Sequence, residues 1–251
     1  MSSKSNDQGR AYEYICLHSL QDAISAIRNS QIIHNSSYEA AEHAWNTLSV
    51  AEKALYTLSA KSTIDTIFAL EPNIVEVGDD TLNLYIQSDE HGEEADVRDI
   101  IIDRKDIVWE IGLSIKHNHM AVKHSRLAKS LDFGKKWYGV NCSEEYWNAV
   151  KPTFDFLEAE KANGTYFRDL NSKEDDVYVR LLKAFMQEVK TQVEKNTEIP
   201  RKLVEYLLSK YDFYKVISID NKRITTIQSF NMYGTLNQAS KAQKPSLEVP
   251  A

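Results

Sequence analysis

An aspartate and a lysine bracket two apolar segments in the middle of the chain. Asp99 precedes the apolar run 100–102, and Lys116 closes the run 107–115 after a polar break at Lys105 and Asp106. This pattern predicts a β-hairpin. A carboxylate can hold Mg²⁺, and a neighbouring cation can orient an attacking water or stabilise charge on a phosphorane. The pair therefore suggests metal-dependent phosphodiester cleavage. The alternative is an ordinary hairpin with solvated end residues.

The segment that follows this predicted hairpin is basic. Between Ile111 and Trp137 the only acid is Asp132, whereas the whole chain has a formal net charge of -7. Total charge therefore does not indicate a nucleic-acid binder. A local basic patch around an acidic metal site is expected in an enzyme that binds a polyanion, and the alternative is a solvated helix face. The basic residues are Lys116, His117, His119, Lys123, His124, Arg126, Lys129, Lys135 and Lys136.

Two stretches around the hairpin resemble a known nuclease family. ADVRDIIIDR at 95–104 and WEIGLSIKHNHMAVKHSRLA at 109–128 resemble the HaeIII-like type II restriction endonucleases, a branch of the PD-(D/E)xK superfamily. The stretches GRAYE at 9–13 and SFNMYGTLN at 229–237 also look like that family. The resemblance implies cleavage of double-stranded DNA within GGCC, with Mg²⁺ as cofactor.

The chain departs from the superfamily pattern at one position. Ser114 stands where the motif expects an acid two residues before the lysine. Glu110 lies on the same strand face, but four residues of strand at ~3.3 Å each place it ~13 Å away. Since related nucleases often contribute a glutamate from the first helix, the resemblance makes Glu13 the better candidate, with an exposed helical acid as the alternative. The predicted catalytic residues are Asp99, Lys116, Ser114 and Glu13, with Asp96 in reserve, and the predicted metal ligands are Asp99 and Glu13.

The basic segment is predicted to contact DNA. A helix over 120–131 would set Lys123 and Arg126 on one side, and its N-terminal amides could accept a phosphate. Asn118 could read a base. The histidines could instead form a zinc site or a His-Asn-His nuclease, but no cysteine pair or second histidine cluster accompanies them. The predicted DNA-binding residues here are His117, Asn118, His119, Lys123, His124, Ser125 and Arg126.

The C-terminal part is expected to help read the DNA sequence. Asn231 and Asn237 supply amide groups that could contact base edges in the major groove. The alternative is an edge hairpin followed by a polar turn. A four-base palindrome has two-fold symmetry, so a homodimer is the economical assembly, although a monomer could cut the strands successively.

Periodicity predicts an α/β fold with a mixed β-sheet flanked by helices. A capping box of Ser49 and Glu52 should begin the third helix, and Pro152 should kink or break a later one. The whole chain, 1–251, is expected to form a single nuclease domain. Its parts are a helical N-terminal layer (1–72), the catalytic hairpin and basic helix (73–140), a helical and β recognition region (141–237) and a loose tail (238–251). Predicted helices are 11–29, 37–48, 51–70, 120–131, 144–160, 175–194 and 200–210, and predicted strands are 82–87, 99–103, 108–116, 213–219 and 224–230.

Composition narrows the class of protein. The chain has 251 residues, of which 42% are hydrophobic, as expected of a globular protein. The N-terminus lacks an apolar h-region and no apolar run approaches ~18 residues, so a cytoplasmic protein is expected, with no membrane partner. Cys16 and Cys142 are too few for a disulfide framework. Two other functions fit less well: a structure-selective repair nuclease or resolvase of the same superfamily, and a non-catalytic DNA-binding module that has lost its acid at Ser114.

Overall fold

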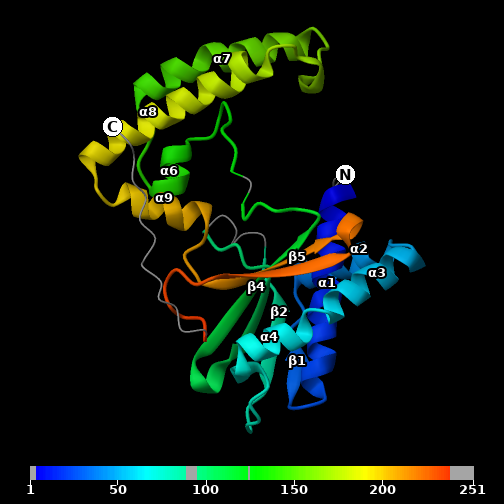
Figure 1. Ribbon diagram of the computed structural model, residues 1–251. Helices are drawn as coiled ribbons and strands as arrows, with labels where there is room; N and C mark the ends of the chain where they lie inside the picture. The colour runs from blue at the N-terminus through cyan, green and yellow to red at the C-terminus, as the bar shows by residue number, and fades with distance from the viewer. Residues whose placement is uncertain (1–3, 89–94, 124, 238–251) are drawn as a thin grey trace. The chain divides into compact units, whose positions relative to one another are not determined.

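The structure, a computed structural model, describes residues 4–88, 95–123 and 125–237 (Figure 1). These residues cluster into two compact units. The first unit holds the described residues up to 123 together with 208–237, and the second holds 125–207. The first unit carries the sheet and the second is helical. The predicted tail, 238–251, lies outside the described residues, and the single nuclease domain stays a prediction.

A mixed sheet organises the first unit, as predicted. In the described part of the chain it has six strands in the order β1-β2-β3-β4-β5-β6. The β1–β2 and β4–β5 pairs are parallel, and the remaining pairs are antiparallel. The last two strands have the bounds that alternation predicts. The strands are β1 (Ser30–Ile32), β2 (Leu82–Ile86), β3 (Ile100–Arg104), β4 (Trp109–His117), β5 (Phe213–Ile219) and β6 (Ile224–Phe230).

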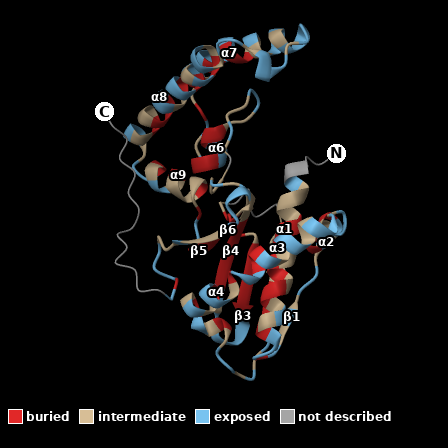
Figure 2. Cartoon of the chain, turned by 45° about the vertical axis from the view of Figure 1, so that its right-hand side comes forward, coloured by how far each residue is buried: buried red, intermediate tan, exposed pale blue. Residues whose placement is uncertain are grey.

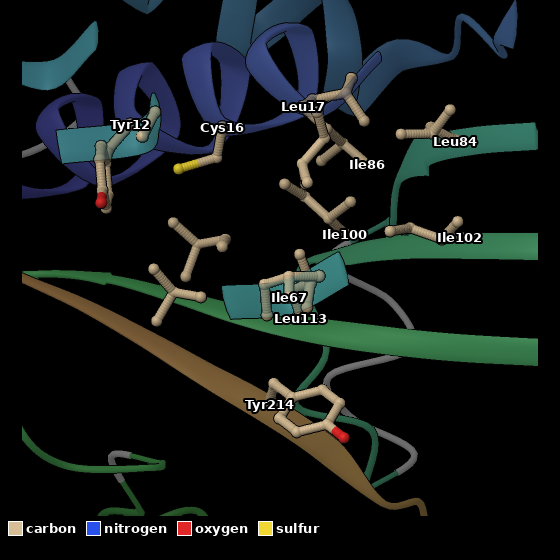
Figure 3. Close-up of a cluster of buried hydrophobic side chains, with 14 of the residues drawn as sticks. Tyr12, Cys16, Leu17, Ile67, Leu84, Ile86, Ile100, Ile102, Leu113 and Tyr214 are labelled. Atoms are coloured by element: carbon tan, nitrogen blue, oxygen red, sulfur yellow. The ribbon is translucent and has the colours of Figure 1, made fainter. Parts of the chain in front are cut away.

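Four helices of the first unit supply a layer against one face of this sheet. They are α1 (Lys4–Ser25), α2 (Ser36–Asn46), α3 (Val50–Lys61) and α4 (Ile64–Leu70). Tyr12, Cys16 and Leu17 of α1 point toward the isoleucines and leucines of β2, β3 and β4 (Figure 3). Strand residues alternate between faces, so the side chains of Ile111, Leu113 and Ile115 that join this core leave Ser114 and Lys116 on the opposite face.

One predicted helix is two helices in the structure. The capping box is confirmed, because Ser49 and Glu52 bond reciprocally at the start of α3. The prediction of a single helix over 51–70 is wrong. The hydroxyls of Ser62 and Thr63 donate to the carbonyls of Ser59 and Ala60, at 2.7 Å each. Such local bonds compete with the helical ladder, and α3 ends at this point.

The second unit is a set of helices. In the views of Figures 1 and 2, α7 (Glu144–Ala162) runs beside α8 (Arg180–Lys195). A π-helix, Glu174–Val179, leads directly into α8. The sequence predicts a kink or a break at Pro152, and the break does not occur. Neighbouring Val150, Thr153 and Phe154 are buried, so their packing supports α7 across the missing hydrogen bond. The other α-helices in the described part of this unit are α6 (Phe133–Tyr138) and α9 (Ile199–Leu207), and a 3-10 helix lies at Phe167–Asp169.

The basic segment after β4 is not helical. Among the described residues between 118 and 132 no helix is present, so the predicted helix over 120–131 is wrong. Asn118 adopts a left-handed backbone conformation with φ 54°. The carbonyl of Met120, which a helix would use internally, accepts a hydrogen bond from the buried Lys215. A tertiary contact thus replaces the first bond of the expected helix.

Candidate active site

Antiparallel pairing brings Asp99 beside the end of β4. Ile100 is opposite Leu113 in the sheet, and the backbone amide of Asp99 donates to the carbonyl of Leu113. Since Ile100 and Leu113 both enter the helix-covered core, Asp99 and Ser114 point to the opposite face. The alternation that predicts the hairpin therefore also explains why Asp99, Ser114 and Lys116 meet.

Three donors from β4 converge on one oxygen of Asp99. Its Oδ2 accepts from the Ile115 backbone amide at 2.6 Å, the Lys116 Nζ at 2.8 Å and the Ser114 Oγ at 3.4 Å. Among the described residues no hydrogen bond reaches the second oxygen, Oδ1. The carboxylate is therefore fixed in orientation and retains an acceptor for a ligand.

Lys116 remains a cation in this setting. Burial disfavours its charge, but attraction and hydrogen bonding from Asp99, with a further contribution from Glu13, raise the pKa of Lys116 above its ordinary value. About a fifth of the side chain is accessible, with relative exposures of 22% for Lys116 and 23% for Asp99. An accessible ammonium of raised pKa can donate to a phosphate oxygen or to a water. It is not a general base at neutral pH.

Glu13 reaches the same region from α1. It follows the fully buried Tyr12, which anchors this turn of the helix by bonding Ser59 at 2.8 Å. Its charge is close enough to act on Lys116. The structure thus brings Glu13 near the pair that the sequence identifies, although the two segments are far apart in the chain.

This set of carboxylates fits a magnesium-type ion. Among the described residues no group of three or more His, Cys, Asp or Glu side chains could hold a metal. Mg²⁺, however, is commonly held by one or two carboxylates and completes its shell with water and substrate phosphate. Asp99, with its unused Oδ1, and Glu13 are two carboxylates that could supply such ligands.

The two other candidate acids are bound to Arg98. Asp96 is buried, and both of its oxygens accept from Arg98 Nε, at 2.9 and 3.2 Å, while Nη2 donates to Oδ2 at 2.8 Å. Glu110 accepts from Arg98 Nη1 at 2.6 Å. The Arg98 side chain lies across Gly112, where an added Cβ would come within 2.0 Å of its Cδ. Arg98 thus forms ion pairs with both acids.

His117 and Asn118 are part of the protein framework. His117 points toward the helical layer, where its ring lies 4.6 Å from that of Tyr56, centroid to centroid. Its Nε2 is 2.8 Å from Asp220 Oδ2. The Asn118 side-chain oxygen accepts from the backbone amide of Asp220 at 2.9 Å, and the backbone amide of Asn118 donates to Ser218 O at 2.7 Å. These contacts fasten the end of β4 to the β5–β6 turn.

The other residues predicted to contact DNA are divided between the two units. His119 and Lys123 are in the non-helical segment of the first unit, whereas Ser125 and the exposed Arg126 belong to the second unit. His124 lies outside the described residues. Asn231 immediately follows β6. Asn237 is tied to the fold, since its backbone amide donates to Glu71 Oε1 at 2.9 Å and its Nδ2 to Leu70 O at 3.2 Å.

Sequence reasoning missed Lys215 on β5. It is paired with Ser114 in the sheet register and is only 1% exposed. In the sequence it lies inside the run FYKVISI, between Tyr214 and Val216. A lysine in the middle of an otherwise apolar strand is the one signal that could have identified it.

The comparisons with known proteins identify the family of the chain. The model of the HaeIII restriction endonuclease family matches residues 9–251. The type II restriction enzyme HaeIII of Haemophilus aegyptius is 49% identical over 251 residues, which are 100% of this chain and 79% of that relative. No solved structure gives a significant match.

The chain has a mixed sheet with an acid and a lysine at the ends of adjacent strands. Together with these relatives, the fold defines a type II restriction endonuclease. Such an enzyme is a site-specific deoxyribonuclease that acts on DNA with a divalent metal ion. The chain belongs to the HaeIII restriction endonuclease family. Within the described residues, no helix combines the length and apolar content that a membrane span requires.

Proposed function

We propose that the chain cleaves double-stranded DNA within GGCC, with Mg²⁺ as the metal ion. The observation that carries the catalytic part is the Asp99 carboxylate, whose Oδ2 is held by three donors of β4 while Oδ1 is unused. The base sequence is taken from the family resemblance of the two central stretches.

The roles follow from charge and position. Asp99 and Glu13 would hold a bound Mg²⁺ ion, which would supply positive charge near the scissile phosphate and lower the pKa of a bound water. Lys116 donates hydrogen bonds to the phosphate and stabilises the negative charge that develops in the transition state. Ser114 holds Asp99 and contributes no charge, so Glu13 takes the role of the acid missing from the motif.

The DNA contacts are divided between charge and sequence reading. His119, Lys123 and Arg126 contact backbone phosphates, which carry no sequence information. Asn231, which follows β6, contacts a base edge. His117, Asn118 and Asn237 act indirectly, because their side chains bond within the protein. A homodimer matches the two-fold symmetry of a four-base palindrome.

Digestion of a plasmid of known sequence with Mg²⁺, followed by mapping of the ends, tests this function. We expect every end to fall within GGCC and no cleavage in EDTA. Ends at junctions or lesions without GGCC would indicate a structure-selective nuclease, and binding without any product would indicate a non-catalytic module. Sedimentation of the protein with and without a GGCC duplex tests the dimer.

A further inference from the structure

Lys215 is a buried cation beside the active site. Its strand neighbour is Ser114, and Tyr214 and Val216 on either side enter the helix-covered core. Lys215 therefore points to the same sheet face as Asp99 and Lys116. Its residue exposure is 1%, compared with 22% for the Lys116 side chain.

The fold alone gives Lys215 little reason to be a lysine. Among the described residues it pairs with no carboxylate, and its Nζ donates to the neutral carbonyl of Met120. Burial and the nearby charge of Lys116 both lower the pKa of Lys215. A buried ammonium with only a carbonyl partner is costly, and an apolar side chain of similar length would fill the same space.

The partner carbonyl belongs to the segment that leaves the active site. This segment, 118–123, follows directly after β4 and contains His119 and Lys123. Its first residue, Asn118, is held by a hydrogen bond from its backbone amide to Ser218 O at 2.7 Å. Two residues further on, Lys215 bonds the Met120 carbonyl, while the Met120 residue is 59% exposed.

We propose that Lys215 is a positioning residue for DNA binding, which tethers segment 118–123 to the sheet so that His119 and Lys123 meet the DNA backbone. The proposal rests on the proposed DNA contacts of this segment. The tether acts on the segment and not on Lys116, because sheet hydrogen bonds and the His117–Asp220 contact already hold the end of β4.

A spin label on residue 120 tests the tether without DNA. Met120→Cys offers an exposed thiol, whereas Cys16 and Cys142 are buried, so labelling is confined to position 120. We expect the label to become more mobile when Lys215→Met is added, and less mobile again with Lys215→Gln, which retains a donor. Lys61→Met, at an exposed lysine of α3, is the matched control and should change nothing. Identical spectra with Lys and Met at position 215 would overturn the tether.

Binding and turnover test the consequence. Lys215→Met should weaken binding to a GGCC duplex about tenfold, the loss expected for one charge-assisted hydrogen bond, and leave kcat at saturating DNA within about threefold. Its Tm should be unchanged or higher. A lowered Tm with parallel losses of binding and kcat would make Lys215 a structural residue and overturn the proposal.

A companion variant separates failure of this inference from failure of the proposed function. If Lys123→Ala weakens DNA binding and Lys215→Met does not, only the role of Lys215 is wrong. If neither variant weakens DNA binding, although Lys215→Met makes the spin label at position 120 more mobile, segment 118–123 does not contact DNA. That result overturns both the proposed contact and the positioning role.

Discussion

Strand β3 has an ionised cluster at each end. At the Arg104 end, Asp80 accepts from Arg28 Nη2 at 2.5 Å and from Arg104 Nη2 at 2.9 Å on Oδ1, and from Arg104 Nε at 2.8 Å on Oδ2. At the other end, three donors share the Oδ2 of Asp99. The side-chain exposures are 8% for Asp80 and 23% for Asp99.

The two carboxylates differ in how many of their oxygens remain free of hydrogen bonds from the described protein. Asp80 uses both oxygens within the protein and joins Arg28, in the turn between α1 and β1, to Arg104 at the end of β3. Asp99 is held on one side and is accessible, so it can take a ligand without losing its orientation. The two acids carry the same charge, but their hydrogen bonds differ. Asp80, bonded through both oxygens, stabilises the fold, whereas Asp99, bonded through one oxygen, is available for chemistry.

The largest expected effect is at the accessible end. Asp99→Asn and Lys116→Met should each lower the cleavage rate by about 10³-fold, since both groups act on the phosphate in the transition state. The free energy of unfolding should change by less than about 1 kcal/mol, because the pair is partly solvated. Single-turnover cleavage and urea unfolding measure the two quantities. A large loss of stability in either variant would make this end structural as well.

The buried end should show the opposite pattern. Asp80→Asn removes the carboxylate from the buried Arg28 and leaves Arg104 with the exposed Glu76 as its ionic partner, which should cost about 3 kcal/mol of unfolding free energy. Cleavage measured where the variant is folded should be unchanged. Asp106→Asn, at an exposed position of the β3–β4 turn, is the control in the same urea titration. Equal stability of the Asp80 and Asp106 variants would contradict the contrast between the two ends.

A smaller effect ranks two glutamates near the accessible end. Glu13→Gln should lower Mg²⁺-dependent cleavage by about tenfold or more, as expected when one of two metal carboxylates loses its charge. Glu110→Gln should have little effect, because Glu110 bonds Arg98. Titrations of rate against Mg²⁺ concentration compare the two variants. The reverse ranking would move the metal toward Glu110.

The smallest effect is a change in the acid dependence of stability. The hydrogen bond from Arg104, opposed in part by burial and supported by Arg28, lowers the pKa of Asp80 from 3.8 to about 2. Ionised Asp80 therefore stabilises the fold fully above pH of about 4, and this contribution is lost as the pH falls toward about 2. Urea unfolding at several acidic pH values should show a shallower decline for Asp80→Asn than for the native chain. Parallel declines would show that Asp80 does not contribute.

The sequence predicts those elements whose structure depends on local patterns. Alternating apolar residues and short polar breaks give both hairpins, and the parity of the first hairpin also brings Asp99 to Lys116. Other elements lack such a pattern. β1 has three residues, and α6 has six between its N-cap Asp132 and Gly139, which ends it with φ 81°.

The rest of the site depends on contacts between distant segments. The helix expected at 120–131 fails to form where Lys215, 95 positions later in the chain, takes the Met120 carbonyl. The resemblance ranks Asp99 above Asp96, but the ion pair that engages Asp96 could not be predicted, because it depends on Arg98 lying across Gly112. Glu13 could be expected only from the resemblance. Its approach to Lys116 comes from the packing of α1.

The close passage of Arg98 over Gly112 also restricts how this sequence can diverge. Any side chain at position 112 would start within 2.0 Å of the Arg98 Cδ, so the arginine would have to leave. Asp96 would then be a buried acid without its cation. The residue tolerated at position 98 thus depends on the residue at position 112. A lineage that replaces Gly112 is therefore expected to replace Arg98 as well.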